Sequence, residues 1–328
     1  MSATRQLTLW GASVAALFLT SPVFAESAVA PEPNALLERM VDAAQQQSYH
    51  GSFVYERSGS FSTHQVWLQH DGDQTSERLL QTDGQPQEWL TRNGDVVCTS
   101  SLAQPAGWRE TDQLAEQLEL LHNWYTLQVL GSTRVADRSV FVLAVKPRDP
   151  YRYAFELYLD QETGLLLKSL LINERSVLLE RFQFTSLELG QVPTESLQTS
   201  GVCLPLQSTA NNVAGQADVG EDWVPGWLPP GFVLGHREVR QLDGGSGELI
   251  TQVYTDGLAR LTLFVEPLGE EGIADDLRAQ LGPTVAISRK LVRAEGDYLA
   301  TVVGELPGAA AERIADSLAP DFDGAGGD

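Results

Sequence analysis

The sequence predicts an α+β protein: one large, strongly curved antiparallel sheet with helices on its concave side, followed by a smaller α+β domain. The turn dipeptides Asp71-Gly72, Asp83-Gly84 and Asn93-Gly94 separate short strand-like runs, and such dipeptides tolerate the positive φ angles of tight hairpin turns. Two stretches of helical periodicity accompany this meander. Periodicity then fails from residue 191 to residue 222, which is longer than an ordinary connection. With 328 residues, two domains are expected.

The larger domain is predicted over residues 26–190 and begins with a helix over residues 35–47. Leu36, Leu37, Met40 and Val41 recur at helical spacing after Asn34, a good N-cap residue. The meander follows from Tyr49 to Ser100. A second helix is expected between Gly107 and Asn123, because Leu114, Leu118 and Leu121 share one helical face. Further strands are predicted over residues 125–130, 139–145, 151–159, 165–172 and 177–187.

The smaller domain is predicted over residues 223–320, after a linker over residues 191–222 in which Ser, Thr, Gln, Asn, Gly and Pro dominate. A helix is expected over residues 308–318. Strands are expected over residues 233–241, 249–255, 260–266, 284–291 and 298–303. The acidic, Gly-rich tail over residues 321–328 is expected to be disordered.

The N-terminal residues 1–25 have the pattern of a cleaved secretory signal. Arg5 precedes a mostly apolar run from Leu7 to Leu19, and Val23-Phe24-Ala25 forms a cleavage site. That run is shorter than the roughly 20 residues needed to span a bilayer, so an exported protein is expected. Because an exported protein meets an oxidising compartment, Cys98 and Cys203 form either a disulfide or two buried thiols.

Composition narrows the function. The net charge is −22 and the pI is about 4.5, which argues against general nucleic-acid binding because that needs a basic surface. No G-x-S-x-G, H-E-x-x-H, Walker or dinucleotide-binding motif occurs. No metal-ligand spacing is present either, so we expect neither an enzyme nor a cofactor.

Two groups of residues are candidates for binding a lipid. Aromatic residues of the meander either pack as core or line a groove, and core packing is the commoner role; the groove candidates are Phe53, Tyr55, Trp67 and Trp89. A basic cluster at a strand end could hold an anionic headgroup or form an ordinary solvated loop; its residues are Lys146, Arg148 and Arg152.

Four segments of the chain resemble the RseB/MucB family, and the match extends over nearly the whole sequence up to Pro320. These segments are Tyr49-His50-Gly51-Ser52-Phe53-Val54-Tyr55, the run from Tyr158 to Lys168, Trp227-Leu228-Pro229-Pro230-Gly231-Phe232, and Tyr254-Thr255-Asp256-Gly257-Leu258. The resemblance implies a LolA/LolB-like open half-barrel with helices in its concavity, joined to a smaller C-terminal domain.

The same resemblance implies a periplasmic regulator of the envelope-stress sigma factor. Such a protein binds the periplasmic part of a transmembrane anti-sigma factor of the RseA/MucA type, shields it from the site-1 protease, and is released by lipid or lipopolysaccharide; in Pseudomonas-like bacteria the output is alginate production. The candidates for contacting the partner are Trp227, Phe232, Arg289, Lys290 and Arg293. The alternative is a periplasmic lipoprotein or lipid carrier of the LolA type, which has no need of a second domain. Homo-oligomerisation is left open.

Overall fold

The computed structural model describes residues 31–100, 111–200, 203–205, 223–242, 247–268, 276–293 and 296–320. The predicted signal over residues 1–25 and the predicted tail over residues 321–328 lie outside these ranges, as do residues 206–222 of the predicted linker.

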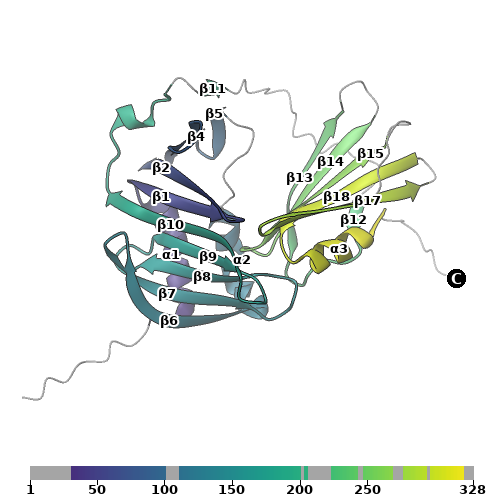
Figure 1. Cartoon of the computed structure of the whole chain (residues 1–328), viewed down its shortest axis with the longest axis horizontal. Coiled ribbons are helices and arrows are strands. Elements are labelled where there is room, and N and C mark those ends of the chain that lie inside the picture. The colour runs from purple at the N-terminus through teal and green to yellow at the C-terminus, as the bar shows by residue number, and fades with distance from the viewer. Residues whose placement is uncertain are drawn as a thin grey trace, which may run out of the picture. The chain divides into compact units, whose positions relative to one another are not determined.

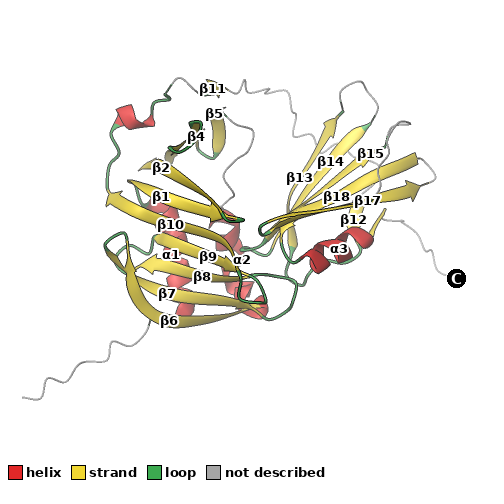
Figure 2. Cartoon of the chain, in the orientation of Figure 1, coloured by secondary structure: helices red, strands yellow, loops and turns green. Residues whose placement is uncertain are grey.

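An eleven-stranded antiparallel sheet, here called the N-terminal sheet, occupies the first part of the chain in the spatial order β11-β5-β4-β3-β2-β1-β10-β9-β8-β7-β6 (Figures 1 and 2). Its ends are β11 and β6, so the sheet is open rather than closed into a barrel. The strands are β1 (Tyr49–Arg57), β2 (Ser60–Asp71), β3 (Gln74–Gln81), β4 (Gln87–Arg92), β5 (Asp95–Thr99), β6 (Tyr125–Val135), β7 (Arg138–Pro147), β8 (Ala154–Asp160), β9 (Leu166–Ile172), β10 (Leu178–Leu189) and β11 (Leu204–Pro205).

The predicted meander is confirmed. The strands β2, β3, β4 and β5 pair consecutively and antiparallel, and the turn dipeptides lie at the connections between them. Between β4 and β5, Asn93 and Gly94 have φ angles of 50° and 84°, as a hairpin turn with two left-handed residues requires. A second such turn, at Ala136 and Asp137 with φ angles of 47° and 61°, joins β6 to β7 without a glycine. That turn was not predicted, since neither residue is a strong signal for it.

Two helices pack together on one face of the N-terminal sheet, α1 (Pro33–Gln46) and α2 (Thr111–Trp124). In Figure 1, α1 lies behind the strands of this sheet. The first helix begins earlier than predicted: Glu32 occupies the N-cap position and Pro33 follows it. Proline suits this position because its missing N–H would have no partner there. Leu36, Leu37 and Met40 of α1 share a buried cluster with Leu114 of α2.

The C-terminal sheet has six antiparallel strands in the order β13-β14-β15-β18-β17-β16. The helix α3 (Gly308–Asp316) contributes Ala310, Ala311 and Ile314 to the core of this sheet. The short strand β16 was not predicted, and all five of its residues are exposed, so it lacks the buried alternation that identifies a strand. The strands are β13 (Val233–Gln241), β14 (Glu248–Thr255), β15 (Arg260–Pro267), β16 (Leu277–Leu281), β17 (Thr284–Arg293) and β18 (Gly296–Glu305); β12 (Trp223–Pro225) and β19 (Leu318–Pro320) pair separately.

The α+β prediction, with one large open antiparallel sheet, helices on one of its faces and a smaller second sheet, is confirmed. The described beginning of the predicted linker is ordered, and includes a 3-10 helix over Thr194–Leu197. Cys203, which follows this 3-10 helix in the sequence, forms a disulfide with Cys98 of β5, and their Cα atoms are 5.6 Å apart.

Candidate functional site

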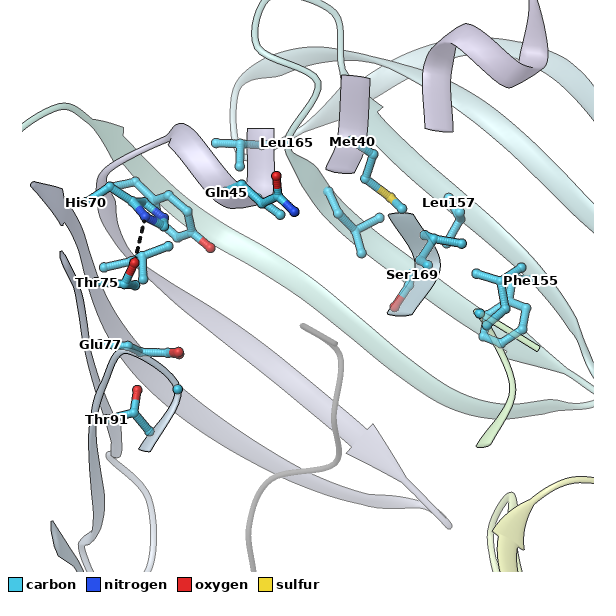
Figure 3. Close-up of a pocket in the computed structure, with 18 of the residues that line it drawn as sticks. Met40, Gln45, His70, Thr75, Glu77, Thr91, Phe155, Leu157, Leu165 and Ser169 are labelled. Carbon is cyan, nitrogen blue, oxygen red and sulfur yellow. Dashed lines mark hydrogen bonds between the residues drawn. The ribbon is translucent and has the colours of Figure 1, made fainter. Parts of the chain in front are cut away.

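A cavity of about 620 Å³ lies on the helix-bearing face of the N-terminal sheet (Figure 3). One wall is apolar and comes from α1, β8, β9 and the turn between β8 and β9. It includes Met40, Phe155, Leu157, Leu165 and Leu166. A volume of this size is within the range of pockets that enclose small organic ligands.

The opposite wall of the cavity is polar and comes from β2, β3 and β4. Residues that pair directly across antiparallel strands point to the same face. Leu68 pairs with Glu77, and Glu77 pairs with Thr91; in the next row, His70 pairs with Thr75. These residues all line the cavity, and the Thr75 hydroxyl lies 3.1 Å from Nδ1 of His70 (Figure 3).

The far end of the cavity is lined by two carboxylates, Glu180 of β10 and Glu305 of β18. Arg57 contacts both of them, with Nη2 2.9 Å from Glu305 Oε1 and Nε 3.8 Å from Glu180 Oε2. The Tyr55 hydroxyl donates a hydrogen bond of 2.6 Å to Glu180. Burial, reinforced by the nearby Glu305 carboxylate, raises the pKa of Glu180 to about 7, although Tyr55 and Arg57 act in the opposite direction. Burial also raises the pKa of Glu305.

Residues from the C-terminal sheet reach the cavity through the turn between β14 and β15, where Gly257 and Leu258 line it. This turn is fixed by Asp256, whose Oδ1 accepts hydrogen bonds from the backbone N–H groups of Leu258 and Ala259 at 3.0 and 2.8 Å. Its Oδ2 accepts hydrogen bonds from the Tyr125 hydroxyl at 2.9 Å and from Nε of Arg152 at 2.5 Å. The sequence predicted the strands on either side of this turn, over residues 249–255 and 260–266, but not this buried cluster.

None of the four lipid-groove candidates lines the cavity. Phe53 and Trp89 are buried in the aromatic and aliphatic core of the sheet, with exposed fractions of 2% and 6%. Tyr55 packs against the same core and reaches the cavity only through its hydrogen bond to Glu180. Trp67 pairs with Arg78, next to the Leu68–Glu77 pair, and therefore points to the opposite face, where Arg78 lies 4.8 Å from its ring.

The basic candidates do not form a headgroup site at the cavity either, because none of the three lines it. Arg152 is buried, and its guanidinium donates to Asp149, Asp256 and the carbonyl of Pro230. Arg148 donates to the carbonyls of His122 and Tyr125, and Lys146 is exposed. These contacts are all within the chain. The Arg152 guanidinium is therefore not available to bind a lipid headgroup.

The candidates for contacting a partner are divided between core and surface. Phe232 is buried in the core of the C-terminal sheet. Trp227 is half-buried between the ring of Tyr151, at 4.9 Å, and the guanidinium of Arg313, at 4.0 Å. The basic residues of β17 are paired within the chain: Arg289 with Asp316, Lys290 with Asp297, and Arg293 with the carbonyl of Leu318.

Sequence reasoning missed the polar wall, the Glu180–Glu305 pair and the Asp256 cluster. The alternation of Glu77 with Leu79 in β3 could have indicated that Glu77 shares a face with core residues. No local signal indicates the other two, because their members are more than 100 residues apart in the sequence.

Two family models match the chain in succession. The MucB/RseB N-terminal domain matches residues 32–202, and the MucB/RseB C-terminal domain matches residues 217–319. The chain belongs to the MucB/RseB family. The resemblance seen in the sequence is therefore confirmed. The MucB/RseB family is one of regulatory proteins rather than of enzymes.

Curated MucB/RseB relatives match along nearly their whole length. The sigma factor AlgU regulatory protein MucB of Pseudomonas aeruginosa is 42% identical over 311 residues, which are 93% of this chain and 96% of the relative. The sigma-E factor regulatory protein RseB of Escherichia coli is 29% identical over 311 residues, covering 90% and 92% of the two chains.

Solved MucB structures share the MucB/RseB fold of this chain. The structure of the Pseudomonas aeruginosa MucA/MucB complex matches with a TM-score of 0.74 at 41% identity, covering 88% of this chain and 99% of the other. A crystal structure of MucB matches with a TM-score of 0.65 at 39% identity, covering 88% and 98%. Within the described ranges, no helix has the length and apolar character needed to cross a membrane.

Proposed function

We propose that this chain binds the periplasmic region of a transmembrane anti-sigma factor of the RseA/MucA type and thereby regulates a sigma factor. The observation that carries the proposal is the 42% identity with MucB over 93% of the chain. The likeness to the MucB chain of the MucA/MucB complex, which extends over 88% of this chain, supports it further.

The chain acts in the periplasm. The predicted export signal supports this location. So does the disulfide between Cys98 and Cys203, because disulfides persist in oxidising compartments and are rare in the cytosol.

The bound chain shields the anti-sigma factor from its site-1 protease and is displaced when a lipid enters the cavity. A ligand shifts an equilibrium only by its difference in affinity for the two states, so the lipid must bind the free chain more tightly than the complex. The lining of the cavity suits this role. It includes Met40 of α1 and Leu157 of β8, and also Leu258 of the turn between β14 and β15 and Glu305 of β18. An occupant therefore contacts both parts of the molecule.

Calorimetric titration of the purified chain with the periplasmic fragment of MucA tests the binding step. We expect saturable binding with a Kd of about 1 μM or lower, equivalent to roughly −8 kcal/mol. The same fragment, incubated with a site-1 protease of the DegS type, should be cleaved more slowly when the chain is present. Absence of binding, together with unchanged cleavage, would remove the proposal.

A further inference from the structure

His64 of β2 is buried in the N-terminal sheet, although histidine is the side chain whose charge ordinarily changes near neutral pH. We propose that His64 makes this sheet sensitive to acid: protonation of its ring loosens the pairing of β1 with β2, and with it the part of the cavity wall that these strands form. Tyr49 of β1 and Leu68 and His70 of β2 belong to that wall. The inference goes beyond the proposed function, because it concerns the chain without its partner.

The strand register places His64 against the aromatic core of the sheet. His64 pairs with Phe53 of β1 on one side and with Gln81 of β3 on the other, so these three side chains share a face. The rings of His64 and Phe53 are stacked, with centroids 4.9 Å apart and planes 13° apart. The Phe53 ring in turn lies 4.9 Å from that of Phe182 and 5.9 Å from that of Phe184. This packing leaves only 4% of His64 exposed.

The hydrogen bonds of the His64 ring suit its neutral form. Nε2 lies 2.9 Å from the hydroxyl oxygen of Ser62. Nδ1 is buried, and among the described residues it has no hydrogen-bond partner. Both ring nitrogens carry a proton in the charged form. Protonation would therefore bury an unpaired N–H donor together with a positive charge, and each of these costs free energy.

The charged groups on the neighbouring strands do not offset this cost. Burial lowers the pKa of His64 from its usual value of 6.5, and the carboxylate of Asp83, in the turn between β3 and β4, acts in the opposite direction with a smaller effect. On β1, Tyr55 and Arg57 lie further along the same face as Phe53. Both are engaged with Glu180 of β10, so they offer no acceptor to a protonated ring.

The folded and opened states of the sheet differ in their affinity for the His64 proton. Once β1 and β2 separate, the ring meets water and titrates near its usual value of 6.5, so the opened state takes up the proton first as the pH falls. The contribution of His64 to stability is therefore complete above pH 6.5 and is lost below it. Glu180 changes stability in the opposite direction over part of this range, since burial raises its pKa to about 7. The effect of His64 is thus measured by comparing the wild type with variants at this position.

Proton NMR titration of the full chain between pH 5 and pH 8 tests the first step of the proposal. The ring signals of the histidines are followed, and the signal lost in His64→Gln, or the one showing contacts with the Phe53 ring in the wild type, belongs to His64. We expect this ring to titrate below pH 6.5 or to remain neutral down to pH 5. Titration at or above pH 6.5 would overturn the proposal.

Hydrogen exchange of the full chain, followed by mass spectrometry at pH 5 and pH 7.5, tests the second step. The rates are corrected for the intrinsic effect of pH on exchange. For peptides covering β1 and β2, the ratio of the wild-type rate to that of His64→Gln should then grow about fivefold or more between pH 7.5 and pH 5. His236→Gln is the matched control, because His236 is exposed on β13, and its ratio to the wild type should not change with pH.

A ratio for His64→Gln that stays constant between the two pH values, or that falls towards pH 5, would contradict the proposal. If His64→Gln does not fold, His64→Phe replaces it, because phenylalanine keeps the aromatic stack on Phe53 and cannot be protonated. The same growth in the ratio is expected for that variant. Faster exchange of the wild type at pH 5 that is equal in both His64 variants would mean that another group carries the acid sensitivity.

Discussion

Oε1 of Glu88 lies 2.6 Å from Nε of Arg78, on the face of the N-terminal sheet that points away from the cavity. The Glu88 side chain is fully buried and also accepts hydrogen bonds from the backbone N–H and the hydroxyl of Ser200. Burial alone would raise the pKa of Glu88, but the hydrogen bonds from Ser200 and Arg78 hold it below its usual value. The pair thus fastens the segment after β10 to β3 and β4.

Glu88→Gln should destabilise the chain by about 3 kcal/mol, because it leaves the largely buried Arg78 without its charged partner. The free energy of unfolding from urea titration measures this loss. Glu162→Gln is the matched control: Glu162 also pairs with an arginine but is 79% exposed, so its removal should cost about 0.5 kcal/mol or less. Equal losses in the two variants would contradict this account of the buried pair.

Replacing Cys98 and Cys203 by alanine should lower the free energy of unfolding by about 2 to 4 kcal/mol. The disulfide links residues 105 apart in the sequence, and closing so long a loop restricts the unfolded chain strongly. Urea titration of the double variant tests this, and wild-type chain treated with a dithiol reductant should show the same loss. A stability unchanged by either treatment would show that the bond does not constrain the chain.

Asp256→Asn should be strongly destabilising, by about 3 to 5 kcal/mol, because Arg152 would lose a fully buried charged partner. Tyr125→Phe provides the comparison. It removes only the hydroxyl that donates to Asp256 and leaves the ion pair in place, so a cost of about 1 to 2 kcal/mol is expected. Thermal or urea unfolding of both variants measures the difference. Similar costs for both would mean that the ion pair adds nothing beyond one hydrogen bond.

The elevated pKa of Glu180 has a consequence for stability. The carboxyl has a pKa of about 7 in the folded chain and about 4.5 when unperturbed, so between these pH values the folded state holds an additional proton. The contribution of Glu180 to stability is therefore greatest below pH 4.5 and falls as the pH rises to 7, by up to about 3 kcal/mol. Glu180→Gln should be more stable than the wild type at pH 8 and nearly equal to it at pH 4.5.

Urea titrations at both pH values test this prediction for Glu180. Glu188→Gln on the same strand is the control, because Glu188 is 79% exposed and should leave the pH dependence unchanged. The groups that face Glu180 are Tyr55, Arg57 and Glu305, and all three remain in the variant. A difference between wild type and Glu180→Gln that does not grow with pH would contradict the elevated pKa.

Local signals in the sequence were sufficient for most elements of the fold. Asn93-Gly94 fixed a hairpin turn because its two left-handed φ angles are a property of the dipeptide itself. The position of a side chain relative to the cavity depends instead on register, and a shift of one residue reverses the face of a whole strand. Trp67 and Leu68 are adjacent, yet only Leu68 lines the cavity.

The roles of charged residues depended on contacts that are distant in sequence. The local sequence predicts either a headgroup ligand or an ordinary solvated loop at Arg152, because it shows only basic and aromatic neighbours. Both interpretations miss the buried partner of Arg152, Asp256, which lies 104 residues away. The polar composition of the segment after β10 predicts a linker. Its described part is held to the sheet by Glu88 and Cys98, which no local pattern reveals.

The central claim is that occupancy of the cavity weakens binding of the anti-sigma factor, and fluorescence anisotropy of a labelled MucA periplasmic fragment tests it most directly. The fragment is titrated with the chain, with and without a saturating amount of dodecanol, a neutral amphiphile with a single alkyl chain. Ser169→Trp is the comparison, because it should fill the cavity beside the apolar wall. The account predicts that the amphiphile raises the Kd of the wild type about tenfold or more, equivalent to 1.4 kcal/mol, and leaves that of Ser169→Trp unchanged. An unchanged Kd for the wild type at saturating amphiphile would contradict it.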